Sequence, residues 1–191
     1  GLSPLLLFFI LILLLAAVLF VSLFFGSVNM DASSVLQILR SALTGAVSED
    51  RNSWNVIIRI RLPRVLLTAA AGAVLSISGI LMQTITRNPL AEPFVLGVSS
   101  GASAGAAGAI VFGWFSFLSI GGTFFCAFIG SFLAIALVLL LQGRSASPVR
   151  LVLTGMGVSS FFQAATTLIV YSARNEAQSR SAMFWLTGSF S

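Results

Sequence analysis

Residues 93–143 read PFVLGVSSGASAGAAGAIVFGWFSFLSIGGTFFCAFIGSFLAIALVLLLQG, and none of them is Asp, Glu, Lys or Arg. As one α-helix this stretch would be roughly 75 Å long at about 1.5 Å per residue, over twice a hydrocarbon core of about 30 Å. The stretch must therefore fold back on itself. Glycine and serine gather between Gly113 and Gly122, beside interfacial aromatic residues such as Trp114, so a turn is predicted there.

The same absence of charge marks three further segments, at residues 1–30, 65–86 and 151–173. Overall, 58% of the residues are hydrophobic and 8% are charged, whereas about a quarter of a soluble domain is charged. The predicted fold class is therefore an all-α, polytopic transmembrane helical bundle. About five spans are expected, at residues 5–25, 65–86, 94–112, 121–141 and 151–171.

The first span is expected to be a retained helix, because about 21 apolar residues exceed the usual hydrophobic region of a signal peptide. The longest polar connection is residues 26–64. Within it, apolar residues recur at helical spacing between Asp31 and Gly45, which predicts an amphipathic helix lying on the membrane surface. The chain begins without Met and stops in an apolar stretch, so residues 1–191 are expected to be a single, incomplete transmembrane domain.

The residues that several kinds of chemistry require are absent from this sequence. The sequence contains no His and no Lys, which excludes a His-based metal site and a phosphate-binding loop within this segment. All five acidic residues fall outside the predicted spans, namely Asp31, Glu49, Asp50, Glu92 and Glu176. The chain is therefore not expected to be an enzyme or to hold a metal or cofactor, and any ATP hydrolysis would belong to another subunit.

Small residues are concentrated within the predicted spans. Gly97, Gly101 and Gly105 are spaced by four, and Gly155 lies in the fifth span. Small residues at this spacing let helix backbones approach closely in lipid. Two interpretations stay open for these glycines, which are the lining of a pathway and tight helix packing alone.

Four segments of the sequence match a known signature in order and spacing. They are RIRLPR at residues 59–64, NPLAEP at 88–93, LTG at 153–155 and MFWLTGSF at 183–190. This pattern resembles the FecCD-type permeases, which are the membrane subunits of importers for ferric siderophores, haem and cobalamin. The resemblance covers essentially the whole chain.

The resemblance implies a full subunit of roughly ten spans in the cell (inner) membrane, of which this chain supplies the first half. The implied partners are a second permease copy, either identical or a paralogue, two cytoplasmic ATP-binding subunits and an extracytoplasmic substrate-binding protein. The segment that docks the ATPase is expected beyond residue 191. An iron-siderophore complex is the expected cargo. Haem or cobalamin import, or a membrane scaffold with no pathway, are the alternatives.

The resemblance also implies roles for particular residues. Arg61 and Arg64, with Arg59, are expected to dock the binding protein, although arginines beside a span also anchor lipid headgroups. Asn88, Pro89, Glu92 and Pro93 form the motif loop between the second and third spans. Ser147 and Pro148 lie where a cytoplasmic gate is expected, and a plain turn is the alternative there.

The orientation implied by the resemblance places residues 26–64 outside the cell. Arginine counts favour the opposite orientation under the positive-inside rule. The loops expected outside hold Arg40, Arg51, Arg59, Arg61, Arg64, Arg174 and Arg180, against Arg87, Arg144 and Arg150 inside. We follow the resemblance, because a docking role explains the excess of arginine outside.

Overall fold

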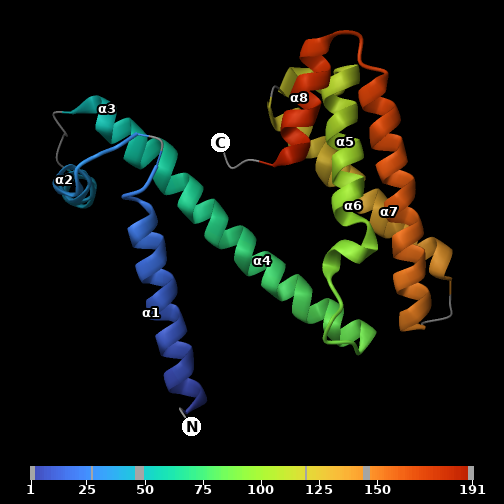
Figure 1. Cartoon of the computed structure of the whole chain (residues 1–191), viewed down its shortest axis with the longest axis horizontal. Helices are drawn as coiled ribbons and strands as arrows, with labels where there is room; N and C mark the ends of the chain where they lie inside the picture. Colours follow the sequence, from blue (N-terminus) through green and yellow to red (C-terminus); the bar gives the residue numbers. More distant parts are fainter. Residues whose placement is uncertain (1–2, 27, 46–49, 119, 144–146, 189–191) are drawn as a thin grey trace. The chain divides into compact units, whose positions relative to one another are not determined.

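The computed structural model describes residues 3–26, 28–45, 50–118, 120–143 and 147–188. These residues form helices and no strand, which confirms the predicted fold class (Figure 1). The chain divides into two compact units, one built on Gly1–Val74 and the other on Leu75–Ser189. The expectation of a single domain stays a prediction.

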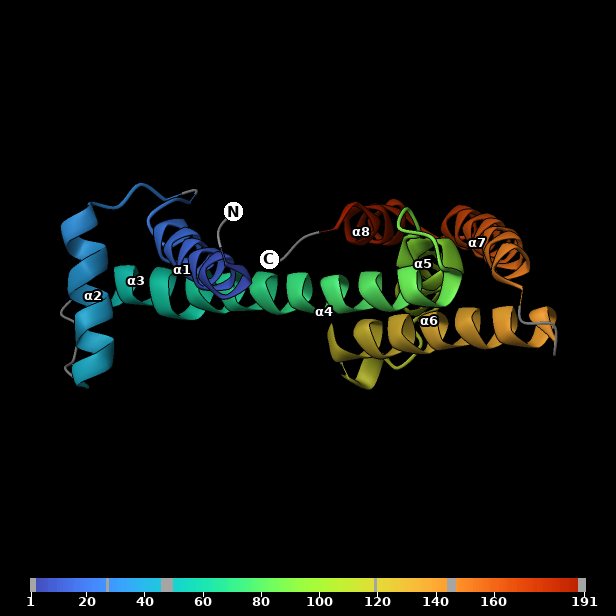
Figure 2. The same cartoon turned by 90° about the horizontal axis from the view of Figure 1, so that it is seen from below.

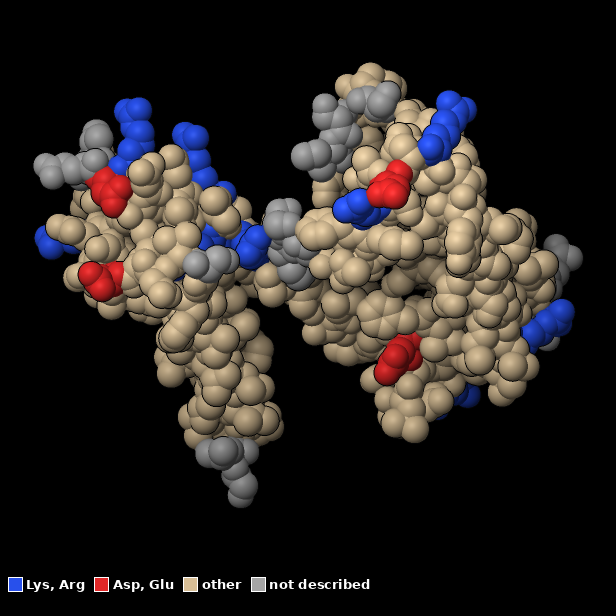
Figure 3. Space-filling model, turned by 45° about the horizontal axis from the view of Figure 1, so that its top comes forward, with Lys and Arg blue, Asp and Glu red and all other residues tan. Residues whose placement is uncertain are grey.

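Within the part of the chain that the structure describes, four helices are long and apolar enough to cross a membrane. They are α1 (Pro4–Ser22), the continuous helix Arg51–Thr86, the helix α6 (Ile120–Gln142) and the helix α7 (Pro148–Tyr171). This result confirms a multi-pass membrane protein. The surface agrees with it, because most of the face seen in Figure 3 is uncharged, with the charged groups in a few places.

The predicted span at 94–112 is shorter than expected. Its helix, α5, is Val98–Phe112 and has 15 residues, about 22 Å at 1.5 Å per residue. Pro93 opens a separate 3₁₀-helix, η2 (Pro93–Leu96), and Gly97 then has a φ of +77°. That left-handed backbone is accessible to glycine at little cost. The break at Gly97 therefore shortens the third span, which the charge pattern alone did not reveal.

The unit that contains the N-terminus holds an amphipathic helix across the first turns of the long helix (Figure 2). This helix, α2 (Ala32–Thr44), ends at Gly45 as the sequence predicts. Its buried residues Val35 and Ile38 pack with Ile57, and Trp54 lies against this cluster. Part of the apolar face predicted to lie on the membrane is therefore covered by protein, whereas Leu36 and Leu43 stay exposed.

The second span begins earlier than predicted. The short helix α3 (Arg51–Trp54), the π-helix η1 (Asn55–Arg61) and α4 (Leu62–Thr86) follow one another without a break. The Leu62 N–H donates to the Ile57 carbonyl, five residues back. In an α-helix the ring of Pro63 would meet the carbonyl four residues before it. We attribute the wider π-turn, which gives that ring more room, to this proline.

The start of α3 is fixed by Asp50. Its carboxylate accepts hydrogen bonds from the backbone N–H groups of Asn52 and Ser53, and from the Ser53 hydroxyl. These bonds, that of the Ser53 hydroxyl first, hold the pKa of Asp50 below its usual value. This cap explains why a polar stretch predicted as a loop is helical.

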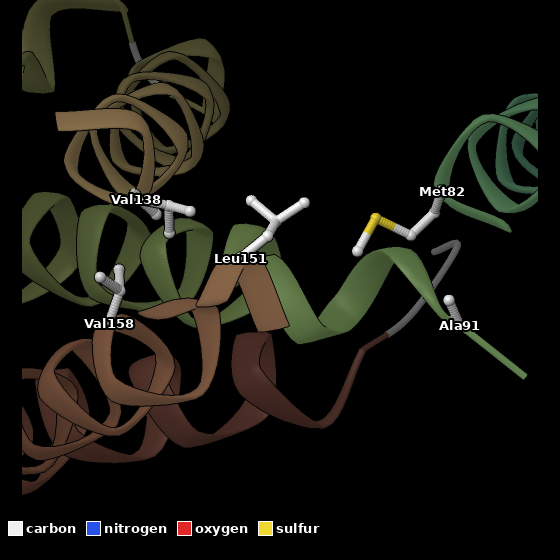
Figure 4. Close-up of a cluster of buried hydrophobic side chains, with 6 residues drawn as sticks. Met82, Ala91, Val138, Leu151 and Val158 are labelled. Carbon is white, nitrogen blue, oxygen red and sulfur yellow. The ribbon is translucent and has the colours of Figure 1, made fainter. Parts of the chain in front are cut away.

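The second unit is organised around α5, which lies between α6, α7 and the helix α8 (Glu176–Thr187) (Figure 2). A buried cluster joins Met82 of α4 to Leu151 and Val158 of α7 and to Val138 of α6 (Figure 4). The turn between α5 and α6 lies where it was predicted and includes the 3₁₀-helix η3 (Ser116–Leu118). The sequence did not predict α8, although Asn175 caps it by accepting a hydrogen bond from the Gln178 N–H at 2.9 Å.

Candidate functional site

The helices α5 and α6 approach each other at glycines. A Cβ built on Gly101 would lie 2.7 Å from the Ala134 Cβ, and one built on Gly130 would lie 2.9 Å from the Gly101 carbonyl carbon. Real Cβ atoms essentially never approach other atoms that closely. A Cβ on Gly105 would meet the backbone of Cys126 in the same way. Both predicted glycines therefore lie at a close contact between helix backbones, which is the packing interpretation.

The contact of α7 with η2 and with the start of α5 uses the other two predicted glycines and a pair of hydroxyls. Gly155 lies against the backbone of Val95 and Leu96, and Gly97 lies against the backbone of Ser159. The Ser100 hydroxyl donates to the Gly97 carbonyl at 2.9 Å, and the Ser100 and Ser159 oxygens are 3.1 Å apart. These hydrogen bonds fix the serines at the edge of a groove.

This groove, of about 700 Å³, lies in the second unit and is bounded by η2, α5, α7 and α8. We call it the hydroxyl groove. Its described lining holds seven polar, uncharged side chains, which are Ser99, Ser100, Ser103, Ser159, Gln163, Thr166 and Thr167, together with Phe94, Val95 and Leu186. The described lining has no ionisable group, so the groove offers hydrogen bonds without a fixed charge.

The predicted motif loop is a compact turn in the second unit. The Asn88 side-chain oxygen accepts a hydrogen bond from the Leu90 N–H at 2.9 Å, and its carbonyl accepts one from Ala91 at 3.1 Å. Arg87 has a φ of +48°, which lets α4 end there. Glu92 and Pro93 then start η2. These residues place η2 beside α7. Ala91 of the loop helps to hold this arrangement, because it packs in the buried cluster that contains Leu151 of α7.

The three arginines predicted for docking differ in exposure. Arg59 and Arg64 are exposed, whereas Arg61 is only 7% exposed. The Arg61 guanidinium donates to the Leu23 carbonyl at 2.8 Å and to the Val28 carbonyl. Its burial differs from the expectation that it faces a partner. A role in docking stays a prediction for the set, and the exposed Arg59 and Arg64 are better placed for it.

The predicted gate is only partly described. Ser147 is the exposed N-cap residue of α7, and Pro148 is the first residue of that helix. The Ser147 carbonyl accepts a hydrogen bond from Leu151 at 3.0 Å. Arg144 and the two residues after it lie outside the described residues. A gate at Ser147 and Pro148 stays a prediction, and the described geometry is that of a helix start.

The sequence was also compared with known proteins. The FecCD transport family matches residues 13–191. The chain belongs to the FecCD transport family. A FecCD relative, the achromobactin transport system permease protein CbrC of Dickeya dadantii, is 40% identical over 184 residues, covering 93% of this chain and 49% of that protein.

Two further likenesses agree with this FecCD assignment. The molybdate import system permease protein MolB of Haemophilus influenzae is 37% identical over 180 residues, covering 93% of this chain and 52% of MolB. A solved structure of a metal-chelate type ABC transporter in an inward-facing conformation has a TM-score of 0.76 and 35% identity, over 95% of this chain and 53% of that one. The FecCD chain described here therefore spans about half the length of these relatives.

Sequence reasoning missed most of the hydroxyl groove. It singled out glycines, whereas the groove is lined by serines, threonines and one glutamine of the same FecCD helices. A signal was present in the sequence. Ser99, Ser103, Ser159 and Gln163 place hydroxyl or amide groups in residues 93–143 and 151–173, two stretches without a charged residue. Such groups are ordinary inside helices, so only their convergence on one groove distinguishes them.

Proposed function

We propose that this chain supplies the first half of a permease subunit of an ATP-driven importer in the cell membrane, and that the imported cargo is an iron-siderophore complex. The hydroxyl groove is the observation that carries this proposal. Polar side chains that converge on one groove at membrane depth are typical of a solute pathway. A neutral lining holds a cargo by weak hydrogen bonds, so the cargo is able to leave again.

The named relatives support this class of function. CbrC carries the name of a siderophore, achromobactin, and the similar structure is of a metal-chelate type transporter. MolB is named for molybdate, so this oxyanion joins haem and cobalamin as an alternative cargo. Nothing in the described lining attracts an anion by charge, which favours a hydrogen-bonding chelate over molybdate.

The proposed partners are those of an ABC importer. They are a second permease copy, cytoplasmic ATP-binding subunits that hydrolyse ATP, and an extracytoplasmic substrate-binding protein. We place docking of the binding protein at Arg59 and Arg64, because both residues are exposed. A guanidinium grips a carboxylate in bidentate fashion, which suits an acidic docking surface.

A cysteine at Gln163 tests whether the hydroxyl groove is a pathway. Gln163 is exposed, lies mid-way along α7 and lines the groove, so Gln163→Cys should react with a water-soluble thiol reagent in the assembled full-length subunit. Modification should reduce cargo uptake at least about fivefold, because the added group fills the groove. The measurement is labelling and uptake in a background lacking other cysteines, with Cys126→Ala.

The matched control is Phe161→Cys, two residues away on the same helix. Phe161 is 61% exposed and does not line the groove, so this cysteine should label slowly and leave uptake unchanged. Equal labelling of both positions, or full uptake after Gln163→Cys is modified, would remove the groove from the pathway.

The proposed orientation has its own test. The helix Arg51–Thr86 has 36 residues, about 54 Å at 1.5 Å per residue, so its two ends lie on opposite sides of a membrane it crosses. Asn52→Cys should be labelled in intact cells by a reagent that does not cross the membrane, and Leu90→Cys should be labelled only after the cells are opened. The reverse pattern would favour the orientation that the arginine counts indicate.

A further inference from the structure

The N-terminal unit contains a small basic pocket whose buried arginine, Arg61, has no part in the transport proposal. It has a volume of about 160 Å³ and lies between the end of α1 and the turns where η1 passes into α4. Arg61 and Arg64 both line it, together with Ser22, Phe25 and Gly26. The described lining contains no carboxylate. We call this pocket the arginine pocket.

Arg61 is held in the arginine pocket by backbone carbonyls. Two hydrogen bonds, to Leu23 and Val28, fix its guanidinium at the C-terminal end of α1. Carbonyl groups at the end of a helix favour a cation. A guanidinium has five N–H donors, so this arrangement leaves three that bond no described protein group. Arg61 forms no ion pair with a described residue.

Gly26 leaves room for the Arg61 guanidinium, because it has no side chain. A Cβ at this position would lie 2.9 Å from both the Nε and an Nη atom of Arg61. The guanidinium therefore lies directly against the backbone of residue 26. A buried positive charge is costly unless an anion or other partner compensates it, so the electrostatics of the pocket favour an anionic ligand.

An apolar groove continues from this pocket along α1. Its volume is about 580 Å³, and it is lined by Leu14, Ala17, Val18, Val21, Ser22 and Phe25. Ser22 and Phe25 line both features. The lining extends over eight residue steps of α1, from Leu14 to Ser22, about 12 Å at 1.5 Å per residue, and then reaches Phe25 beyond the end of this helix. The helix α1 is long and apolar enough to cross a membrane. A polar head and an apolar tail of one ligand would fit the two features together.

We propose that the arginine pocket and the adjoining groove bind an anionic phospholipid, with its phosphate at Arg61 and Arg64 and an acyl chain along α1. The end of α1 and the start of the apolar part of α4 both belong at the membrane surface, where lipid phosphates lie. A protein carboxylate would leave the apolar groove unused. This proposal does not depend on which cargo the transporter carries.

The test is lipid binding to the purified full-length subunit by native mass spectrometry, with phosphatidylglycerol and phosphatidylcholine as the two probes. Phosphatidylglycerol should bind at least about tenfold more tightly. Arg64→Gln should remove most of the preference for phosphatidylglycerol. Ala17→Phe should weaken the binding of both lipids, because the larger side chain fills the groove. Arg59→Gln is the matched control, because Arg59 does not line the pocket, and it should bind as the unaltered protein does.

Gly26→Ala provides a second variant, since it acts on the guanidinium of Arg61 without removing a charge. This substitution should lower phosphatidylglycerol binding. The variant should still elute from size-exclusion chromatography as the unaltered protein does. Equal binding of the two lipids, or equal effects of Arg59→Gln and Arg64→Gln, would overturn the proposal. Complete competition by inorganic phosphate would indicate a phosphate site. Loss of binding-protein capture in Arg64→Gln with unchanged lipid binding would indicate docking, and either result overturns the lipid site.

Discussion

Replacing Gly101 with valine should prevent the full-length subunit from accumulating as folded protein. A Cβ at Gly101 would lie 2.7 Å from the Ala134 Cβ and 2.9 Å from the Gly130 carbonyl carbon. Neither neighbour is the end of a flexible side chain, so the two helices would have to separate. Overpacking costs about 1–3 kcal/mol where side chains adjust, and a backbone contact should cost at least the upper value. Thermal unfolding in detergent, with the yield of monodisperse protein, measures this loss.

Gly157→Val is the control for helix propensity. Gly157 lies within α7 and is exposed, and a Cβ added there would have no heavy atom within 4 Å beyond its own stretch of helix. The same change of residue type should therefore leave folding nearly unchanged. A comparable loss of folded protein in Gly157→Val would mean that the close contact between α5 and α6 is not the cause.

The positions of the charged residues in the sequence predicted much of the helical architecture. The lack of charged residues located α1, α6 and α7 to within a few residues, because a charge at membrane depth is costly whatever the helix packs against. The predicted start of the third span was wrong, because Pro93 and Gly97 break the helix inside an uncharged stretch. A hydropathy pattern reports burial in lipid and does not report backbone conformation.

The site was less predictable than the spans. The glycines Gly101 and Gly105 were singled out correctly as close-contact positions, but their partners Gly130 and Cys126 lie on another helix. The burial of Arg61 was not predictable, because it depends on the carbonyls of Leu23 and Val28, more than thirty residues earlier. Long-range contacts of this kind have no local sequence signal.

Omitting the full-length subunit should abolish uptake by the proposed importer. The permease is the only proposed component that provides a path through the membrane, and a metal chelate does not cross a hydrocarbon core unaided. The loss should therefore be nearly complete, at least about tenfold. A membrane scaffold without a pathway would instead reduce uptake in part, because the path would lie in another subunit.

ATP-dependent uptake into proteoliposomes is the most direct measurement of the proposed transport function. The full-length subunit would be reconstituted with its ATP-binding subunit and binding protein, and offered labelled ferric siderophore, haem, cobalamin and molybdate separately. We expect uptake of the ferric siderophore that requires ATP, the permease and the binding protein together. Uptake of only one of the other three compounds would show that the proposed cargo is wrong and would identify the true one. Uptake of none of them, or siderophore uptake that persists without the permease, would contradict the proposed function.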